Sequence, residues 1–512
     1  MLAKAVGLFT FAFLALLSSV VFINRSQAQE AGRNSPPVIP KTWDDEAVAS
    51  LEVPLAEASA SPVQIPADYY YRMPVRPVYK SYPVYAPGKE PRGYFERLTQ
   101  QEPEIVFDPA KLKTEADWIK AGELVFEAPI GYENDLFGSI VRVPDVRNPA
   151  WYEKANIPVT NDGIMPFAGY VIRKKGVVEV GGLSCAMCHT RVMPDGTVIK
   201  GAQGNFPFDR TLAFVAPTLG PFEQGRPVLR LLFAAPWLQP DPQARLEQIS
   251  LEEFTSNAEA IPPGVLARHG TSPFSPAQVP DLIGIKERRY LDRTGLVRHR
   301  DIGDLMRYGA LNQDADVLAR YGDFRPIEVV FGKLPDPAML SRYSDEQLYA
   351  LALYIYSRKP PPNPNKRTPL AVQGEKVFQR EGCATCHTPP LYTSNKLTPA
   401  EGFRVPDDHR TRFDILPLSV GTDPTLTLTT RRGTGYYKVP SLKGVWYRGP
   451  FEHNGSVATL EDWFDPRRLR DDYVPTGWKG YGVKTRAVKG HEFGLKLSAD
   501  DKRSLIAFLK TL

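Results

Sequence analysis

Apolar positions spaced three or four apart predict two pairs of amphipathic helices that recur along the chain. Residues 122–126 (Gly-Glu-Leu-Val-Phe) return as residues 374–378 (Gly-Glu-Lys-Val-Phe), each with one apolar face. Residues 344–354 return as residues 498–508, and each copy begins with a serine followed by acidic residues, which predicts an N-cap and a favourable first turn. The repeated order of these helices predicts a mainly α fold with two similar domains in tandem.

A second repeat lies between the helices of each pair. Val279-Pro-Asp-Leu-Ile-Gly-Ile285 is matched by Val439-Pro-Ser-Leu-Lys-Gly-Val445. Eleven residues after the glycine of each copy comes a second glycine, Gly295 or Gly455. The repeat therefore extends through the loops as well as the helices.

Proline-rich segments divide the chain. Four prolines within residues 360–366 predict a stiff linker that no helix crosses. It separates a first domain with insertions, residues 111–359, from a second domain, residues 367–512. Ahead of both lies an arm, residues 29–110, in which residues 68–85 alternate tyrosine, proline and basic side chains. This composition favours an extended segment packed over the body, with a docking strip for a partner as the alternative.

The first 28 residues predict export. Lys4 precedes an apolar run from Ala5 to Ile23, and Ser26-Gln-Ala28 is typical of a signal-peptide cleavage site. The apolar run is long for a signal peptide, so an uncleaved membrane anchor is the alternative. We therefore expect a periplasmic or secreted protein that contacts a membrane only if this segment is retained.

Composition adds two constraints. The net charge of +5 over 512 residues is too small to indicate a nucleic-acid partner. The 49 prolines predict long irregular loops around compact helical parts.

The cysteines carry the chemistry. All four lie in two C-x-x-C-H motifs, Cys185-Ala-Met-Cys188-His189 and Cys383-Ala-Thr-Cys386-His387. Two thiols at this spacing reach the two vinyl groups of one porphyrin, and the following imidazole binds the iron. Disulfides would leave two identical histidines unexplained, and a zinc site needs four ligands. The motifs thus predict two cytochrome c-like domains, each with one covalently bound haem c, and His189 and His387 as proximal iron ligands.

The sixth ligand of each iron decides what the haems can do. His491 lies in the loop Gly490-His-Glu-Phe-Gly494, seven residues before Ser498, where a loop can fold over a haem face. The matching residue of the first domain is Pro337, which cannot bind iron, while Met339 is the alternative ligand there. We therefore expect a first haem open to dioxygen or peroxide and a second haem that relays electrons. A pure electron carrier with both irons six-coordinate is the alternative.

Three further basic residues are candidates for contacts with haem propionates. His453 occupies the repeat position at which the first domain has Arg293, and His299 lies between two arginines. These types suit a carboxylate better than an iron. A solvated basic loop is the alternative interpretation.

Two segments carry a resemblance to a known superfamily. Val439-Pro-Ser-Leu and residues 449–460 resemble the second haem domain of bacterial di-haem cytochrome c peroxidases and their methylamine-dehydrogenase-maturation relatives. Residues 490–494 are more similar to the branch that contains the di-haem rubber oxygenase. That branch implies a second haem bound by both His387 and His491.

The resemblance also implies roles beyond the second haem. It implies that His189 holds the catalytic haem, which binds a small oxidant, and that a periplasmic electron donor or acceptor is the partner. The chain departs from the peroxidases because no methionine follows His387. A calcium ion between the domains, as in those peroxidases, is left open, as are the substrate and the oligomeric state.

Overall fold

The computed structural model describes residues 37–512 except 134, 136–140, 240 and 242–243. The predicted export segment, residues 1–28, lies outside the described residues. Within the described residues, no helix is long and apolar enough to cross a membrane.

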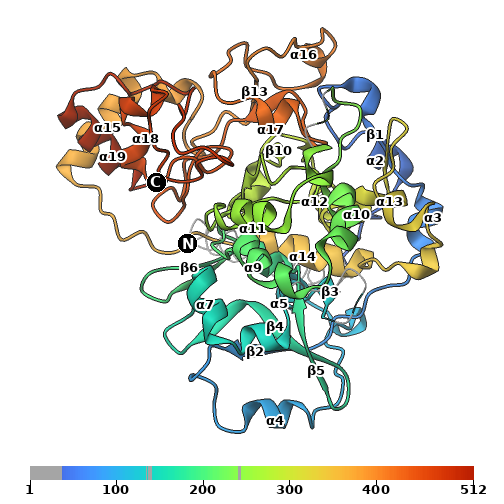
Figure 1. Cartoon of the computed structure of the whole chain (residues 1–512). Helices are drawn as coiled ribbons and strands as arrows, with labels where there is room; N and C mark the ends of the chain where they lie inside the picture. Colours follow the sequence, from blue (N-terminus) through green and yellow to red (C-terminus); the bar gives the residue numbers. More distant parts are fainter. Residues whose placement is uncertain (1–36, 134, 136–140, 240, 242–243) are drawn as a thin grey trace, which may run out of the picture.

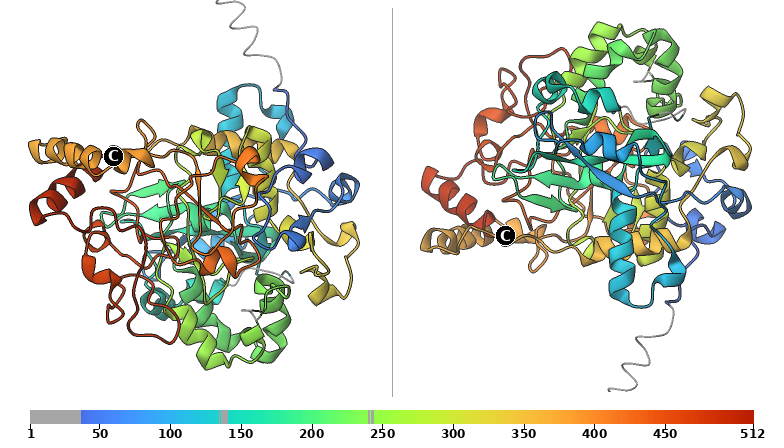
Figure 2. Two further views of the ribbon diagram at one scale, coloured as in Figure 1. Left: turned by 90° about the horizontal axis from the view of Figure 1, so that it is seen from above. Right: turned by 90° about the horizontal axis from the view of Figure 1, so that it is seen from below.

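Two helix pairs with the same packing organise the chain. Helix α5 (Glu115–Glu127) packs on α14 (Asp345–Ser357), and α15 (Pro369–Arg380) packs on α19 (Ala499–Leu509). Figure 1 shows α15 and α19 together at one side of the molecule, away from the first pair. The two views of Figure 2 also show the second pair at an edge of the molecule.

The four helices begin at residues whose side chains cap the first turn. Ser344 and Ser498 accept hydrogen bonds from the backbone N–H groups of Gln347 and Asp501. Thr114 and Thr368 do the same for α5 and α15. The caps satisfy N–H groups that lack a partner inside the helix.

One glycine in each pair sets how closely the helices approach. A Cβ atom on Gly122 would lie 1.9 Å from the carbonyl oxygen of Ala350, and one on Gly374 would lie 1.8 Å from that of Ser504. Neither position therefore accepts a side chain without moving a backbone. The two crossings are equivalent, since both glycines belong to the repeated segment.

The remaining helices are mostly short. They are α2 (Asp45–Ala49), α3 (Ala67–Arg72), α4 (Tyr94–Leu98), α6 (Val143–Val146), α7 (Pro149–Ala155), α8 (Cys185–His189), α9 (Phe208–Val215), α10 (Phe222–Phe233), α11 (Leu251–Glu259), α12 (Ile302–Asn312), α13 (Glu328–Phe331), α16 (His409–Arg412), α17 (Thr425–Leu428) and α18 (Leu460–Trp463).

A four-stranded antiparallel sheet is a feature that the sequence did not predict. Its order is β2 (Ser81–Tyr85), β4 (Ile164–Lys174), β5 (Val177–Gly182) and β3 (Gly131–Tyr132). Helices still outweigh strands, so the expectation of a mainly α fold holds only in part.

In the part of the chain that the structure describes, five two-stranded ribbons make up the other sheets. They are β1 (Pro62–Val63) with β12 (Arg320–Tyr321), β6 (Thr190–Val192) with β7 (Val198–Lys200), β8 (Val265–Leu266) with β9 (Ala277–Gln278), β10 (Tyr290–Leu291) with β11 (Val297–Arg298), and β13 (Leu397–Pro399) with β14 (Tyr436–Lys438).

The N-terminal arm is built into the body. Trp43 and Tyr70 are fully buried and stack with ring centroids 4.6 Å apart. Residues Ala67–Arg72 form α3 and residues Ser81–Tyr85 pair with β4, where the sequence predicts an extended segment. The helix forms because it buries Tyr69 and Tyr70 on one side.

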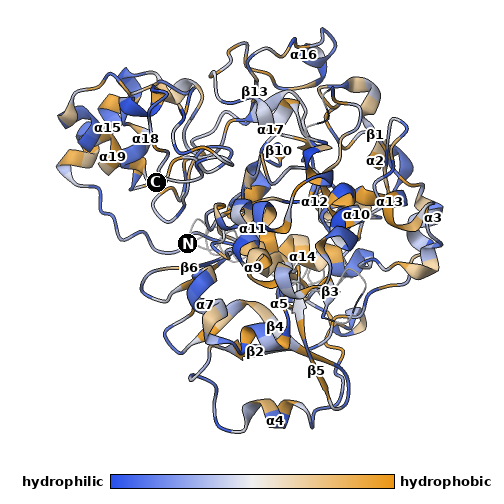
Figure 3. Cartoon of the chain, viewed as in Figure 1, coloured by the Kyte–Doolittle hydropathy of each residue, from blue (hydrophilic) through white to orange (hydrophobic). Residues whose placement is uncertain are grey.

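The largest core lies around α5, α12 and α14, and the arm contributes to it. Figure 3 shows α14 as a mostly hydrophobic helix at the centre of the molecule. A smaller core lies between α15 and α19 and includes Val377, Phe378, Leu505 and Phe508. The two C-x-x-C-H motifs lie beside these two cores, since Cys185 packs against the first and Cys383 against the second.

Candidate functional site

The first C-x-x-C-H motif forms a short helix, α8, in the interior of the fold, where Ala186 and Met187 are buried. Ser184 caps α8 by accepting a hydrogen bond from the backbone N–H of Met187 (3.1 Å). Both cysteines are free thiols. Burial raises the pKa of Cys185 to about 12 and that of Cys188 to about 11, so both thiols are protonated at neutral pH.

The His189 ring is oriented by a residue of the loop repeat. Its Nδ1 lies 3.0 Å from the carbonyl oxygen of Pro280, so Nδ1–H donates to that oxygen. Burial, together with the nearby cations of Arg268 and Arg293, lowers the pKa of His189 to about 4 although the hydrogen bond to Pro280 opposes the shift. The imidazole is therefore neutral, and its Nε2 is left with a lone pair suited to a metal.

The second motif repeats this arrangement closer to the surface. Residues Cys383–Thr385 form a single helical turn, and His387 Nδ1 lies 3.1 Å from the carbonyl oxygen of Pro440 and 3.2 Å from that of Tyr392. Pro280 and Pro440 are equivalent positions of the loop repeat. The Val-Pro segment thus sets the ring orientation of both histidines, a role that the sequence repeat alone did not reveal.

His491 faces His387 although 104 residues separate them in the chain. Their ring centroids are 6.2 Å apart, with 58° between the ring planes. Two imidazoles on opposite sides of one metal, with metal–nitrogen bonds of about 2 Å, have centroids about 6 Å apart. The spacing therefore fits a pair of axial ligands.

Several contacts hold the His491 backbone in place. Its N–H donates to the carbonyl oxygen of Val420 (2.7 Å), and its own carbonyl oxygen accepts from Nη2 of Arg468 (2.9 Å). Its φ of 47° lies in the left-handed region, which is strained for a residue other than glycine. Its ring lies 5.1 Å from that of Trp463. The conformation is thus imposed by the surrounding residues, as expected for a functional position.

The residues present fit two haem c groups. Each motif offers two free thiols and a neutral histidine whose Nδ1 is already bonded, and the second adds a facing histidine. Cys185, Cys188 and Cys383 keep partly exposed surfaces although burial raises their pKa values, as expected for groups beside an internal space. Haem would supply redox chemistry at its iron here.

His189 differs from His387 in what faces its imidazole ring. No other histidine ring in the described part of the chain lies against His189 as His491 lies against His387. Met339, the alternative ligand, belongs to the turn Pro337–Met339 and its side chain is 67% exposed. This exposure does not favour Met339 as a ligand of an iron at His189.

The three candidates for propionate contacts have different surroundings. Arg293 donates from Nε and Nη2 to the carbonyl oxygens of Gln278 and Val279. His299 has both ring nitrogens engaged, Nδ1 with the carbonyl oxygen of Arg288 and Nε2 with the hydroxyl of Tyr356, each at 2.6 Å. Of these two, only Arg293 keeps a donor group for another ligand.

The third candidate, His453, pairs with its neighbour. Its Nδ1 lies 2.5 Å from a carboxylate oxygen of Glu452, and its ring lies 4.6 Å from that of Tyr437. Although burial opposes it, the His453 contact holds the pKa of Glu452 at about 2. The imidazole therefore already has an acidic partner within the chain.

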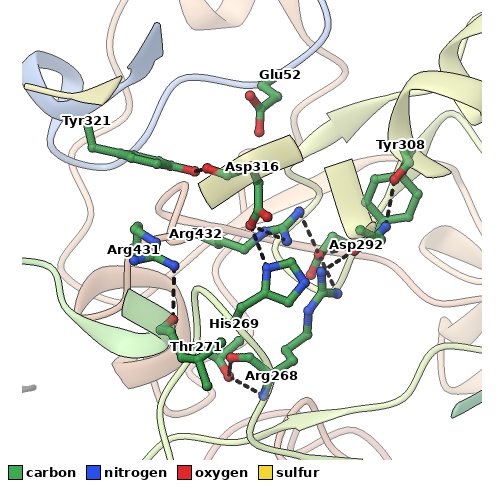
Figure 4. Close-up of polar contacts among 12 residues, drawn as sticks. Glu52, Arg268, His269, Thr271, Asp292, Tyr308, Asp316, Tyr321, Arg431 and Arg432 are labelled. Carbon is green, nitrogen blue, oxygen red and sulfur yellow. Dashed lines mark hydrogen bonds and ion pairs between the residues drawn. The ribbon is translucent and has the colours of Figure 1, made fainter. Parts of the chain in front are cut away.

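A separate cluster of buried charges lies between the two halves (Figure 4). His269 Nδ1 is 2.6 Å from Asp316, and Arg268 is 3.1 Å from Asp292. Arg432, from the second half, reaches Asp316 at 3.4 Å. The cluster joins the halves and accounts for His269, which points toward Asp316 in the figure.

The described residues contain no site at which side chains alone would bind a metal ion. No group of three or more His, Cys, Asp or Glu side chains there could hold a metal ion. The calcium ion that the resemblance leaves open thus gains no support.

The paired thiols and the oriented histidines have the arrangement of c-type haem attachment sites. Residues 435–474 match the RoxA-like, cytochrome c-like family, and this segment includes Pro440 and the Gly449–Leu460 stretch. In this segment the chain is similar to cytochrome c-like proteins, and this similarity supports haem c as a cofactor. This match supports the resemblance to the rubber-oxygenase branch of the di-haem cytochrome c peroxidase superfamily within residues 435–474.

Other similarities cover less of the chain or are weaker. The uncharacterized protein y4iJ of Sinorhizobium fredii (strain NBRC 101917 / NGR234) is 35% identical over 106 residues, which are 15% of this chain and 18% of that protein. The chain thus spans under a fifth of that relative.

Two solved structures overlap with the chain at low TM-scores. Kuenenia stuttgartiensis hydrazine synthase, pressurized with xenon, shares 15% identity over 50% of this chain and 79% of its own, with a TM-score of 0.27. A MauG-like protein associated with microbial copper homeostasis shares 21% identity over 33% of this chain and 56% of its own, with a TM-score of 0.22.

Proposed function

We propose that this chain is an exported di-haem c-type cytochrome oxidoreductase, oxygenase-like or peroxidase-like in its chemistry. The haem at His189 is the site for dioxygen or peroxide, and the haem between His387 and His491 relays electrons. A periplasmic electron donor or acceptor is the partner. The observation that carries the proposal is the asymmetry between the two motifs, because His387 has a facing histidine at 6.2 Å whereas His189 has none among the residues that the structure describes.

The chain's own residues have distinct parts in this proposal. The carbonyl oxygens of Pro280 and Pro440 accept hydrogen bonds from the Nδ1–H groups and so fix the orientation of both proximal imidazoles, while burial keeps the rings neutral. Arg468 and Val420 hold the strained loop that presents His491. A fixed histidine on the second side closes that haem to small ligands, so the relay exchanges electrons without binding the oxidant.

The depth of the two motifs supports this division of labour. His189 lies in the main body, next to the larger core, whereas Thr385 and Thr388 beside the second motif are exposed. A haem near the surface suits exchange with a partner protein, and a haem in the interior suits a reaction kept away from bulk water.

The test is an electron paramagnetic resonance spectrum of the holoprotein together with carbon monoxide binding to its reduced form. We expect one high-spin and one low-spin haem, with carbon monoxide taken up by one haem of the two. Replacing His491→Ala should convert the low-spin haem to high-spin and raise the uptake to two. The control is His409→Gln, since His409 bonds Tyr436 through Nδ1 and has no ring contact with His387.

Two results would contradict the proposal. Two low-spin haems that ignore carbon monoxide would instead support an electron carrier with both irons six-coordinate. A His491→Ala protein with an unchanged spectrum and full haem content would remove His491 as a ligand.

A further inference from the structure

Four basic side chains gather where the two halves meet. Arg288 and Arg293 come from the loop after Pro280, and Lys438 and Arg448 flank Pro440. Each is half-buried. Burial lowers the pKa of Lys438 well below its ordinary value, and the positive charges of Arg293, Arg288 and Arg448 lower it further. The two halves are in direct contact here, since the backbone N–H of Lys438 donates to the carbonyl oxygen of Arg293 (3.2 Å).

None of the four forms an ion pair with a carboxylate among the described residues. The polar contacts of the arginines are with backbone carbonyl oxygens: Arg288 with Ile283 (3.2 Å), Arg293 with Gln278 and Val279 (3.0 and 3.2 Å), and Arg448 with Ser441 (2.7 Å). The Nε of Arg448 is buried without any hydrogen bond to the described chain.

The nearest acidic groups compensate only part of this charge. Asp292 pairs with Arg268 at 3.1 Å. Asp281 accepts a hydrogen bond from the hydroxyl of Tyr447 at 2.8 Å, and the charges of Arg448 and Arg288 act on it and oppose the rise in its pKa that burial causes. It is therefore one carboxylate near four cations. Glu287 also acts on Arg288 but is exposed to solvent. The cluster thus keeps an excess of positive charge.

A cluster with excess positive charge destabilises the fold unless an anion binds to it. Partial burial removes the hydration of the cations, and this loss of free energy is offset only where a counter-charge and hydrogen bonds replace the water. Arginine forks match carboxylates in a bidentate geometry, and lysine adds a compact positive charge. The cluster therefore has the chemistry of a carboxylate site.

The positions of the arginines connect the cluster to both haem motifs. Arg288 and Arg448 each lie eight residues after the proline that orients a proximal histidine. Arg293 donates to the carbonyl oxygens of Gln278 and Val279, just before Pro280, and Arg448 donates to that of Ser441, just after Pro440. The cluster thus lies beside both segments that orient the proximal histidines.

We propose that Arg288, Arg293, Lys438 and Arg448 form a single carboxylate-binding site, shared by the propionate groups of the two haems. The inference rests on the presence of two haems in the proposed function and not on the open coordination of either iron. Because the site faces both haems, its charges stabilise the reduced form of each. The reduction potentials of the two haems are therefore set together by one group of residues.

The test is spectroelectrochemical titration of the holoprotein carrying Arg288→Met or Arg448→Met. Each substitution removes one positive charge and is expected to disfavour reduction of both haems by roughly tenfold, which is 59 mV for a one-electron couple. Arg289→Met is the matched control, because Arg289 is the next residue, is 64% exposed in its side chain and pairs with Asp414 at 3.1 Å. It should leave both potentials unchanged.

Three outcomes would overturn the shared site. One is a shift confined to a single haem in both variants, and another is no shift in either haem. The third is a response of the native potentials to added inorganic phosphate, since that would mean the site is open to solution anions. If the methionine variants fail to fold, Arg448→Lys keeps the charge and should retain both potentials to within a small shift.

The outcome can be separated from a failure of the proposed function. Haem content by pyridine haemochromogen and carbon monoxide uptake are measured on the same samples. If neither haem binds carbon monoxide, the proposed dioxygen or peroxide site is wrong. The effect of the substitutions on the two reduction potentials can still be measured in that case.

Discussion

The contact at Gly374 allows the stability of the second helix pair to be tested directly. In Gly374→Ala, the new Cβ would lie 1.8 Å from the carbonyl oxygen of Ser504 and 2.8 Å from Cβ of Phe508. The obstructing atoms belong to the backbone and to a Cβ, so no rotamer change relieves the clash. The two helices would have to separate by about 1.6 Å to reach the 3.4 Å of ordinary contact.

The magnitude follows from two opposing effects. Overpacking of this kind costs roughly 1–3 kcal/mol and occasionally more, and here it also loosens the contacts of Val377, Phe378, Leu505 and Phe508. Alanine regains up to about 1 kcal/mol over glycine in a helix interior. We therefore expect a net loss of about 2 kcal/mol, which lowers the Tm by roughly 4–8 °C for a unit of 150–250 residues.

The assay is a thermal melt of the holoprotein followed by far-ultraviolet circular dichroism and by haem absorbance. Gly225→Ala is the control, since Gly225 lies in α10 and a Cβ there would meet nothing within 4 Å. It should keep or slightly raise the Tm. A Gly374→Ala protein that melts at or above the native temperature would refute the close helix crossing.

Two further predictions use the haem motifs and a buried histidine. The double substitution Cys185→Ser and Cys188→Ser should halve the covalently bound haem per chain in the pyridine haemochromogen assay, and unchanged haem content would contradict attachment at the first motif. Burial lowers the pKa of His299, so below about pH 6.5 the unfolded chain binds a proton that the folded chain does not, and stability falls as the pH falls. His299→Gln should flatten the dependence of Tm on pH between about 5 and 7, whereas profiles that run parallel to the native one would exclude His299 as its source.

The helices were predictable from local signals. Ser344 and Ser498 cap α14 and α19 as the serine-plus-acid pattern predicts, and the apolar stripes of α5 and α15 pack against these helices. Each signal is contained within a dozen residues, so no knowledge of the tertiary structure is needed.

The sheet was not predictable in the same way. Strand β2 contains Pro83, and its pairing with β4 has a register shift between Pro83 and Val84. Proline weakens the strand signal, and the partner lies about 80 residues further along the chain. Pairing over such a distance depends on the tertiary fold and not on the local pattern.

At the candidate site, the sequence identifies the residues that could bind haem iron or propionates but not the residues that each of them contacts. The glycine-flanked loop singles out His491, yet only the fold brings it to His387. Nothing near His453 in the sequence distinguishes its pairing with Glu452 from a contact with a cofactor. The equivalence of Arg288 and Arg448 could have been found by extending the Val-Pro repeat by three residues.

The burial of the first C-x-x-C-H motif has a consequence for the order in which haem attachment and folding can occur. A thiol reacts as its thiolate, and burial raises the pKa of Cys185 to about 12, so the folded chain presents an inert sulfur. Attachment of a haem at the first motif would therefore have to precede completion of the fold around Cys185. The porphyrin would then be a surface around which this part of the chain completes its fold.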